Sequence, residues 1–230
     1  MQNPWRTLSV PNSNYVLDLD RDVWQFTSCF PPQPYLGRFE QSGVLWLLGG
    51  FGTGERMAIT DEDCSSDVLD WVKRNLSQEL PSEPNLWLTP RDSSHPLEKT
   101  RDVKWWRKAV RPVHEALSQA LDEKIAWERL ASHLFVLEAF PYPAKTRPNK
   151  ILPSHAHSIY LINLWIDSGR PILLGRAEKF WCDLAPKLIN ALASKQCLRA
   201  KNFQSASISP NNLVDGEKDF ALILNALLYR

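Results

Sequence analysis

The stretch LFVLEAFPYP at residues 134–143 decides the fold that we expect for this chain. Its first seven residues are apolar except for Glu138, which is typical of a buried strand, and two prolines close the stretch. A carboxylate is rarely buried without a partner, so Glu138 either pairs with an arginine or faces a binding site. We favour the site, because Glu138 lies near the carboxyl end of its strand, where parallel sheets bind ligands.

Short apolar runs recur on both sides of this stretch. They predict three further strands, at residues 44–48, 171–175 and 204–208. Apolar spacing and capping residues predict helices at residues 66–78, 103–121, 154–168, 177–194 and 217–228. Pro112 and Pro186 are expected to interrupt or bend two of these helices. Strands that alternate with helices predict a three-layer α/β/α fold around a central, mainly parallel four-stranded sheet.

The length and charge of the chain limit its organisation and partners. The 230 residues suit one domain, residues 44–230, with an irregular N-terminal extension, residues 1–43, packed on it. The net charge of +1 excludes a basic field over the whole surface, so contacts with DNA would need a local patch. Most of the ten tryptophans are expected in the core, although such rings also suit base stacking.

The cysteines and the N-terminal segment indicate a compartment. The four cysteines form no C-x-x-C motif, and no histidine pair follows at zinc spacing. We therefore expect reduced thiols, no metal and no cofactor. The first ten residues are polar and contain Pro4, and no apolar run approaches the length of a membrane span. We expect a soluble, cytoplasmic monomer without a membrane partner.

Two strand-end loops offer candidate base-binding and catalytic groups. After the first strand, GGFGTGE at residues 49–55 lets the backbone approach a ligand at Gly50, and Phe51 could stack under a base. This loop lacks the Gly-Lys-Ser/Thr ending of a phosphate-binding loop, and a plain chain-reversing turn is an equal alternative. After the second strand, Tyr142 could hold the other side of a base.

The remaining loops offer groups that bind phosphate. A helix is expected to begin near Arg176 and Lys179, and its free amides and these two side chains could hold a phosphate. A helix start without any ligand is an equal alternative. The last loop places hydroxyls and amides together, and Ser and Asn side chains suit phosphate oxygens; a capped turn is the alternative. The candidate DNA-binding residues are Lys145, Arg147, Arg176, Lys179, Ser209, Asn211 and Asn212.

Taken in order, these loops resemble those of the uracil-DNA glycosylase superfamily. The segment SPNNL at residues 209–213 is similar to the family's Ser-Pro loop, which pinches the DNA backbone, and residues 135–142 resemble its base-reading strand. The likeness covers roughly residues 31–228. It also includes residues 171–181, Trp105-Trp106 and LPS at residues 152–154. The resemblance implies a uracil-DNA glycosylase-like fold and excision of a flipped-out base.

The chain departs from the family pattern at three positions. The family's histidine in the last loop falls at Ser207, which we keep as a catalytic candidate with Glu138 and Glu55. The family's Asp or Asn of the first loop is not evident in residues 49–54, and Glu55, Asp61 or Asp63 could take its place. The base-reading asparagine falls at or near Glu138. An ionised carboxylate only accepts hydrogen bonds, which suits the amino group of a cytosine-type base.

The resemblance and Glu138 together predict a monofunctional DNA glycosylase that acts on a modified cytosine-type base and leaves an abasic site. Its partner would be DNA with a modified or damaged base, and a role in defence against phages with modified DNA is an extension of this idea. The alternatives are a catalytically silent module that binds nucleic acid or nucleotides, a uracil-specific repair glycosylase, and a small-molecule hydrolase or glycosyl transferase. His155 and His157, at a helix start, are expected to be surface or capped residues without a role in binding, and contact with a pocket or a phosphate is the alternative.

Overall fold

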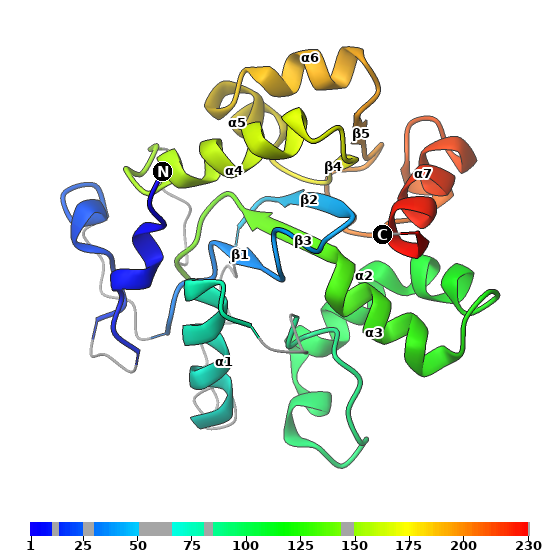
Figure 1. The fold of residues 1–230 in the computed structure, drawn as a ribbon, viewed down its shortest axis with the longest axis horizontal. Helices are drawn as coiled ribbons and strands as arrows, with labels where there is room; N and C mark the ends of the chain where they lie inside the picture. Colours follow the sequence, from blue (N-terminus) through cyan, green and yellow to red (C-terminus); the bar gives the residue numbers. More distant parts are fainter. Residues whose placement is uncertain (11–13, 25–29, 51–65, 81–84, 144–149, 230) are drawn as a thin grey trace.

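A central sheet of five strands organises the described part of the chain (Figure 1). The computed structural model describes residues 1–10, 14–24, 30–50, 66–80, 85–143 and 150–229. Within these ranges the strands lie in the order β1-β3-β2-β4-β5. The strands are β1 (Tyr35–Leu36), β2 (Val44–Leu48), β3 (Leu134–Glu138), β4 (Ile172–Leu174) and β5 (Cys197–Arg199). Only β1 is antiparallel to its neighbour β3, so the expected mainly parallel α/β fold is confirmed.

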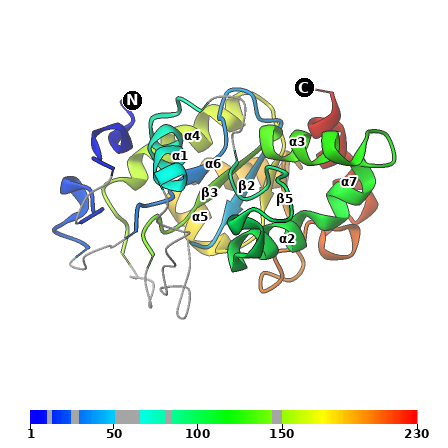
Figure 2. The same cartoon turned by 90° about the horizontal axis from the view of Figure 1, so that it is seen from below.

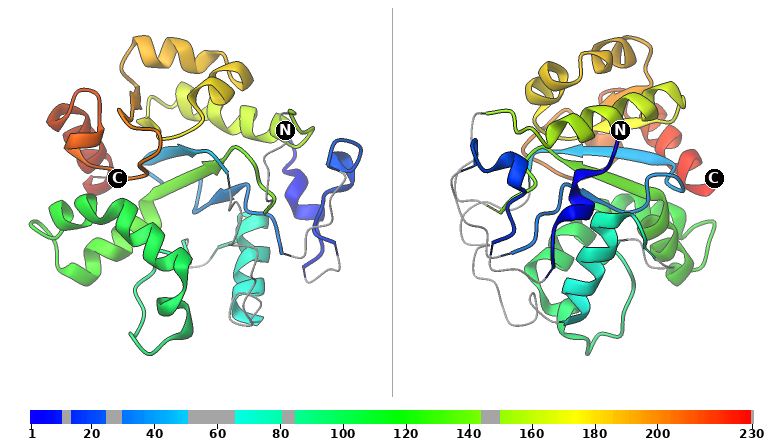
Figure 3. Two further views of the ribbon diagram at one scale, coloured as in Figure 1. Left: turned by 180° about the vertical axis from the view of Figure 1, so that it is seen from behind. Right: turned by 60° about the vertical axis from the view of Figure 1, so that its left-hand side comes forward.

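Helices cover both faces of the sheet and form the outer two of three layers. The lower layer in Figure 1, which Figure 2 views from its own side, consists of α1 (Ser66–Ser77), α2 (Arg101–Leu117) and α3 (Glu123–His133). The opposite face carries α4 (His155–Asp167), α5 (Glu178–Leu184) and α6 (Lys187–Ala193), as both views of Figure 3 show. The last helix, α7 (Glu217–Leu228), contacts α2 and α3. This double cover explains why every residue of β2 and β3 is buried and nearly every one is apolar.

The predicted fourth strand is wrong in position, and the predicted strand number is wrong. Residues 204–208 form no strand, and the fourth parallel strand is β5, which pairs with β4 through Cys197 and Ile172. In the 204–208 segment, the backbone N–H of Ile208 donates instead to the carbonyl of Ala109 in α2, at 2.9 Å. The fifth strand, β1, contains only two residues, which is too short to produce a recognisable apolar period.

Prolines act differently in the two helices that contain them. Pro186 divides the segment predicted at 177–194 into α5 and α6, because its ring prevents the helix from continuing across it. Pro112 instead lies inside α2, which begins at Arg101 after the side chain of Thr100 accepts the N–H of Val103, at 3.3 Å. Helix α3 was not predicted, and its buried residues are only Ala126, Leu130 and Ala131.

The N-terminal extension belongs to the same core as the sheet. It contains the 3-10 helices η1 (Pro4–Thr7) and η2 (Asp18–Asp20), and it also supplies β1. Two further 3-10 helices, η4 (Pro96–Lys99) and η5 (Pro210–Asn212), lie in later loops. Trp5 and Trp24 are buried in one continuous cluster with the strand residues. No helix in the described ranges is both long enough and apolar enough to cross a membrane.

Candidate functional site at the carboxyl edge of the sheet

The strand order identifies one edge of the sheet as the place for a ligand. Along the chain, β2 is followed by β3 on one side of it, and then by β4 on the other side. In doubly wound sheets the binding crevice lies outside the carboxyl ends of the strands at the point where this order reverses. That point lies between β2 and β4, so the loops that begin at Gly49 and at Gly175 border it.

A close approach of backbone to side chain fixes the second of these loops. The N–H of Gly175 donates to the carbonyl of Leu47, at 3.0 Å. A Cβ atom on Gly175 would lie 2.4 Å from Nε1 of Trp46, well inside van der Waals contact. Glycine is therefore required here, and the loop after β4 starts directly against β2.

Glu138 reaches from β3 to the loop after β2. It pairs with Leu48 in the parallel ladder, and its side chain is only 5% exposed. Its Oε2 accepts the backbone N–H of Gly50, at 2.8 Å. Gly50 has a φ of +134°, which residues with a side chain rarely adopt. Glycine is therefore needed at the position whose N–H binds the carboxylate of Glu138. The predicted carboxylate and the predicted glycine are thus brought together at the carboxyl edge.

Tyr142 has a different task from the predicted base contact. It is 1% exposed, and its ring packs between Trp5 and Trp24 of the extension. Its hydroxyl donates to Asp20, at 2.7 Å, and accepts the N–H of Leu17, at 3.1 Å. Burial and the neighbouring Asp20 carboxylate raise the pKa of this hydroxyl. The ring is therefore enclosed by the extension and is not placed to stack on a base.

Asp20 is a buried structural acid that the sequence analysis missed. It is fully buried, and besides Tyr142 it accepts the N–H of Ser154, at 2.9 Å, just before α4. One carboxylate thereby joins the extension, the loop after β3 and the start of α4. A lone Asp in an irregular segment gives no periodic signal, so its burial could not be read from the chain.

The loop after β4 joins the sheet to the last loop. Arg176 donates to the carbonyl of Gln204, at 2.6 Å, and its guanidinium lies 6.0 Å from the ring centre of Trp105. Lys179 is exposed and pairs with Asp183 one helical turn later, at 2.6 Å. Arg176 is thus tied to protein groups, whereas Lys179 remains on the surface.

The last loop is built around Asn212, whose side chain is committed internally. Its Nδ2 donates to the carbonyl of Ser207, at 2.8 Å, and its Oδ1 accepts the N–H of Asn202, at 3.1 Å. This corrects the prediction that Asn212 grips a phosphate, because the buried amide already stabilises residues 202–207. Asn211 is exposed and Ser209 half-buried, and Ser207 is also half-buried.

His155 is a buried structural residue, so the expectation of a surface or capped histidine is wrong for it. Its Nδ1 accepts the N–H of Leu152, at 2.9 Å, and its Nε2 lies 2.8 Å from the carbonyl of Ala139. Because a carbonyl can only accept, Nε2 carries the proton. Burial lowers the pKa of the ring, which favours this neutral form. His155 therefore fastens α4 to the loop after β3.

Several predicted residues fall outside the described ranges. These are Phe51, Glu55, Asp61, Asp63, Lys145 and Arg147. Of the four cysteines, the structure describes Cys182 and Cys197, both free thiols whose pKa is raised, chiefly by burial. Within the described part of the chain, no group of three or more His, Cys, Asp or Glu residues could hold a metal ion.

Comparison with known proteins gave no relative: no family model, no curated protein and no solved structure matches this chain.

Proposed function

We propose that this protein is a monofunctional DNA glycosylase that hydrolyses the N-glycosidic bond of a flipped-out, modified cytosine-type base and leaves an abasic site. The proposal rests on one observation above all. A buried carboxylate, Glu138, lies at the carboxyl edge of a mainly parallel sheet and is held by the Gly50 amide. This carboxylate lies at the carboxyl end of β3, one strand away from the switch point between β2 and β4 and on the side of the sheet where doubly wound folds bind their ligands.

The chemistry follows from what a fixed carboxylate can do. Breaking an N-glycosidic bond builds positive charge on the sugar, and a preorganised carboxylate stabilises that charge or activates the attacking water. Glu138 suits this role because its hydrogen bond to Gly50 orients one oxygen before any substrate arrives. In the alternative role, at the opposite edge of the base from the glycosidic bond, the carboxylate would accept from the exocyclic amino group of a cytosine-type base and so favour that base over uracil.

The proposed DNA contacts are the predicted basic and polar residues that the structure leaves at the surface. Lys179 and Asn211 are accessible, and Ser209 is half-buried beside Asn211. Lys145 and Arg147, which lie outside the described residues, are added to the proposed set from the sequence alone. Contacts of this kind position a duplex without reading its sequence, so the base itself would decide specificity. Defence against phages with modified DNA is the biological role that we propose as an extension of this activity.

The experiment uses oligonucleotides that each carry one uracil, hydroxymethylcytosine or glucosylated hydroxymethylcytosine. After incubation, alkali cleaves any abasic site, and strand lengths are read on a gel. We expect cleavage at a modified cytosine, with E138Q reducing the rate about 100-fold, a typical loss for one catalytic acid–base group. The matched control is E115Q, which alters an exposed glutamate paired with Arg111. Intact strands with every substrate would refute the proposal.

A second candidate is a catalytically silent nucleic-acid-binding module of the same fold. It is favoured by Ser207, which stands where the resemblance leads us to expect a histidine, and by the engagement of Glu138 with the loop backbone. Tight binding of DNA without abasic product, unchanged in E138Q, would support this candidate. Cleavage of the uracil substrate alone would instead support a uracil-specific repair glycosylase and remove the argument from Glu138 to cytosine.

A further inference from the structure

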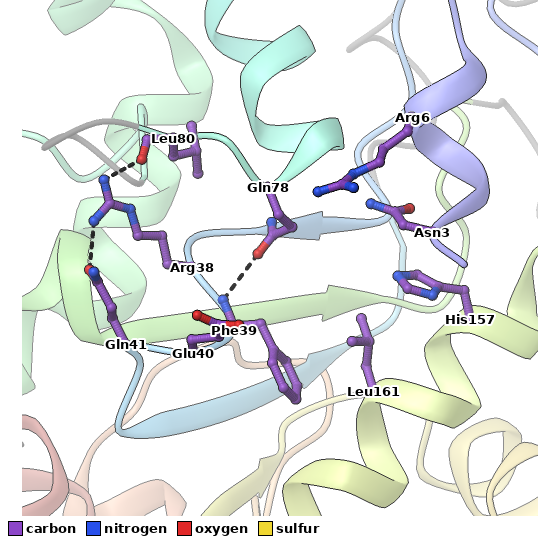
Figure 4. A pocket seen from close by; sticks show the side chains of 10 residues that line it. All are labelled: Asn3, Arg6, Arg38, Phe39, Glu40, Gln41, Gln78, Leu80, His157 and Leu161. Atoms are coloured by element: carbon purple, nitrogen blue, oxygen red, sulfur yellow. Dashed lines mark hydrogen bonds between the residues drawn. The ribbon is translucent and has the colours of Figure 1, made fainter. Parts of the chain in front are cut away.

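A pocket of about 460 Å³ lies beside β1, the edge strand, and none of the predicted DNA-contact residues lines it (Figure 4). Its walls come from four separate segments. These are η1 with Asn3, the β1–β2 connection, the end of α1 near Gln78, and α4 with His157. The volume falls within the usual range for small-molecule sites.

His157 is the most unusual group in the wall of this pocket. The residue is 7% exposed, and neither ring nitrogen has a hydrogen-bond partner among the described residues. Its ring contacts are with the rings of Tyr35 and Tyr160. Buried polar atoms are nearly always hydrogen-bonded, so a buried imidazole without a partner at a pocket wall points to a ligand. His155, two residues earlier, has both ring nitrogens satisfied and shows the contrast.

Arg6 supplies the charge on the same side of the pocket as His157 (Figure 4). Its Nε donates to the carbonyl of Ser77, at 3.0 Å, which fixes the side chain. Its two terminal nitrogens have no hydrogen-bond partner among the described residues. In Arg38, across the pocket, both terminal nitrogens are already bonded, to Gln41 and to the carbonyl of Leu80. Arg6 therefore keeps a forked donor pair for an oxyanion.

The charges and apolar side chains that line the pocket indicate what kind of ligand it fits. The two positive charges of Arg6 and Arg38 outweigh the one carboxylate of Glu40. Phe39 and Leu161 add an apolar surface beside these charges. A pocket with a positive rim and an apolar wall matches a compact organic anion better than a cation or a neutral sugar.

We infer that this pocket binds a small organic oxyanion, a carboxylate or a phosphate monoester, with a compact apolar body. The forked donors of Arg6 and the ring of His157 hold the oxyanion, and Phe39 and Leu161 contact the body. The inference is independent of the proposed activity on DNA, because the pocket shares no residue with the Glu138 site. A bound anion would also join η1 to α4 and so fasten the extension to the domain.

Nuclear magnetic resonance of the full chain with labelled histidine tests the inference. The probes are phenyl phosphate, benzoate and the neutral benzamide. We expect phenyl phosphate or benzoate to shift the ring signals of His157 saturably at millimolar concentration, and benzamide to leave them unchanged. Which of the two anions binds more tightly identifies the phosphate or the carboxylate class. The His157 signals are assigned as those that disappear in H157Q.

Two arginine variants separate a built site from general charge attraction. R6Q should weaken binding about tenfold or more, because it removes the forked donors. R111Q, which alters an arginine with a 74% exposed side chain that pairs with Glu115, should bind like the parent chain. Thermal melts of both variants check that the fold is intact. The inference is overturned if neither anion shifts the His157 signals, or if R6Q binds as tightly as R111Q.

Discussion

At the scale of single residues, partners rather than residue types decide what each side chain can do. Glu138 and Asp20 are both buried acids, yet one meets a loop amide at the carboxyl edge and the other meets a tyrosine hydroxyl inside the extension. His155 and His157 lie two positions apart, but only His155 has hydrogen-bonded ring nitrogens among the described residues. The sequence draws attention to Glu138 and the two histidines but not to Asp20, and only the contacts separate the roles of the four.

The hydrogen bond between Glu138 and Gly50 predicts different effects for two substitutions. In E138Q the side-chain carbonyl can still accept the Gly50 N–H, so we expect stability to change by less than about 1 kcal/mol. In E138A that buried donor loses its acceptor, and we expect a loss of about 1–3 kcal/mol. Urea unfolding of the two variants measures the difference. Equal losses would show that the Gly50 contact contributes little to the fold.

His157 predicts a dependence of stability on pH. Burial lowers the pKa of its ring to about 4, whereas an unfolded histidine has its ordinary value of 6.5. Between these values the unfolded chain binds a proton that the folded chain does not, so acid weakens the fold as the pH falls below 6.5. We expect His157 alone to cost about 2 kcal/mol on going from pH 7.5 to pH 5.

The control for this prediction is H157Q, which carries no titrating group at position 157. Urea unfolding of the parent and of H157Q at pH 7.5, 6 and 5 gives two curves. The difference in stability between the two proteins should change in favour of H157Q as the pH falls. Parallel curves would contradict the prediction, since the remaining histidines and acids are common to both proteins.

At the scale of elements, the extension and α4 are held by polar contacts as well as by packing. Asp20, at the end of η2, accepts from Tyr142 after β3 and from the Ser154 amide before α4. One acid thus fixes the positions of three segments far apart in sequence. Apolar contacts alone are less directional, so this contact sets the geometry of the junction.

The pair formed by Asp20 and Tyr142 is tested by a double-mutant cycle. Y142F removes one donor from a fully buried carboxylate, and we expect a loss of about 1–3 kcal/mol. D20A, which removes the acceptor, and the double variant complete the cycle, and the coupling energy should be at least about 1 kcal/mol. Y229F, at a tyrosine that is 82% exposed, is the control and should be neutral. Additive effects would mean that the two side chains act independently.

At the scale of the whole molecule, the sequence predicts the three layers of the fold, but it does not predict the contacts that join segments far apart in the chain. The apolar runs at 44–48 and 134–138 and the helix at 217–228 agree with β2, β3 and α7, because burial on both faces or one face leaves a clear pattern. The prediction put the last strand at residues 204–208 and missed β5, because a strand of three residues is too short to show a recognisable apolar pattern. Glu138 and Gly50 could be paired from strand order, but the roles of Asp20, Tyr142 and Asn212 depend on long-range contacts.

The shared core predicts that the extension and the sheet unfold together. Trp5, in η1, is 2% exposed and its ring lies 5.8 Å from that of Tyr142, so W5A should cost about 3–5 kcal/mol. Because Trp5 belongs to the same cluster as the strands, that loss should also lower the protection of Val136 in β3 against hydrogen exchange.

Circular dichroism and tryptophan fluorescence should give one coincident unfolding transition. L222A, at a leucine that is 47% exposed, should cost less than about 1 kcal/mol. An early transition that leaves Val136 protected would instead make the extension a separate folding unit.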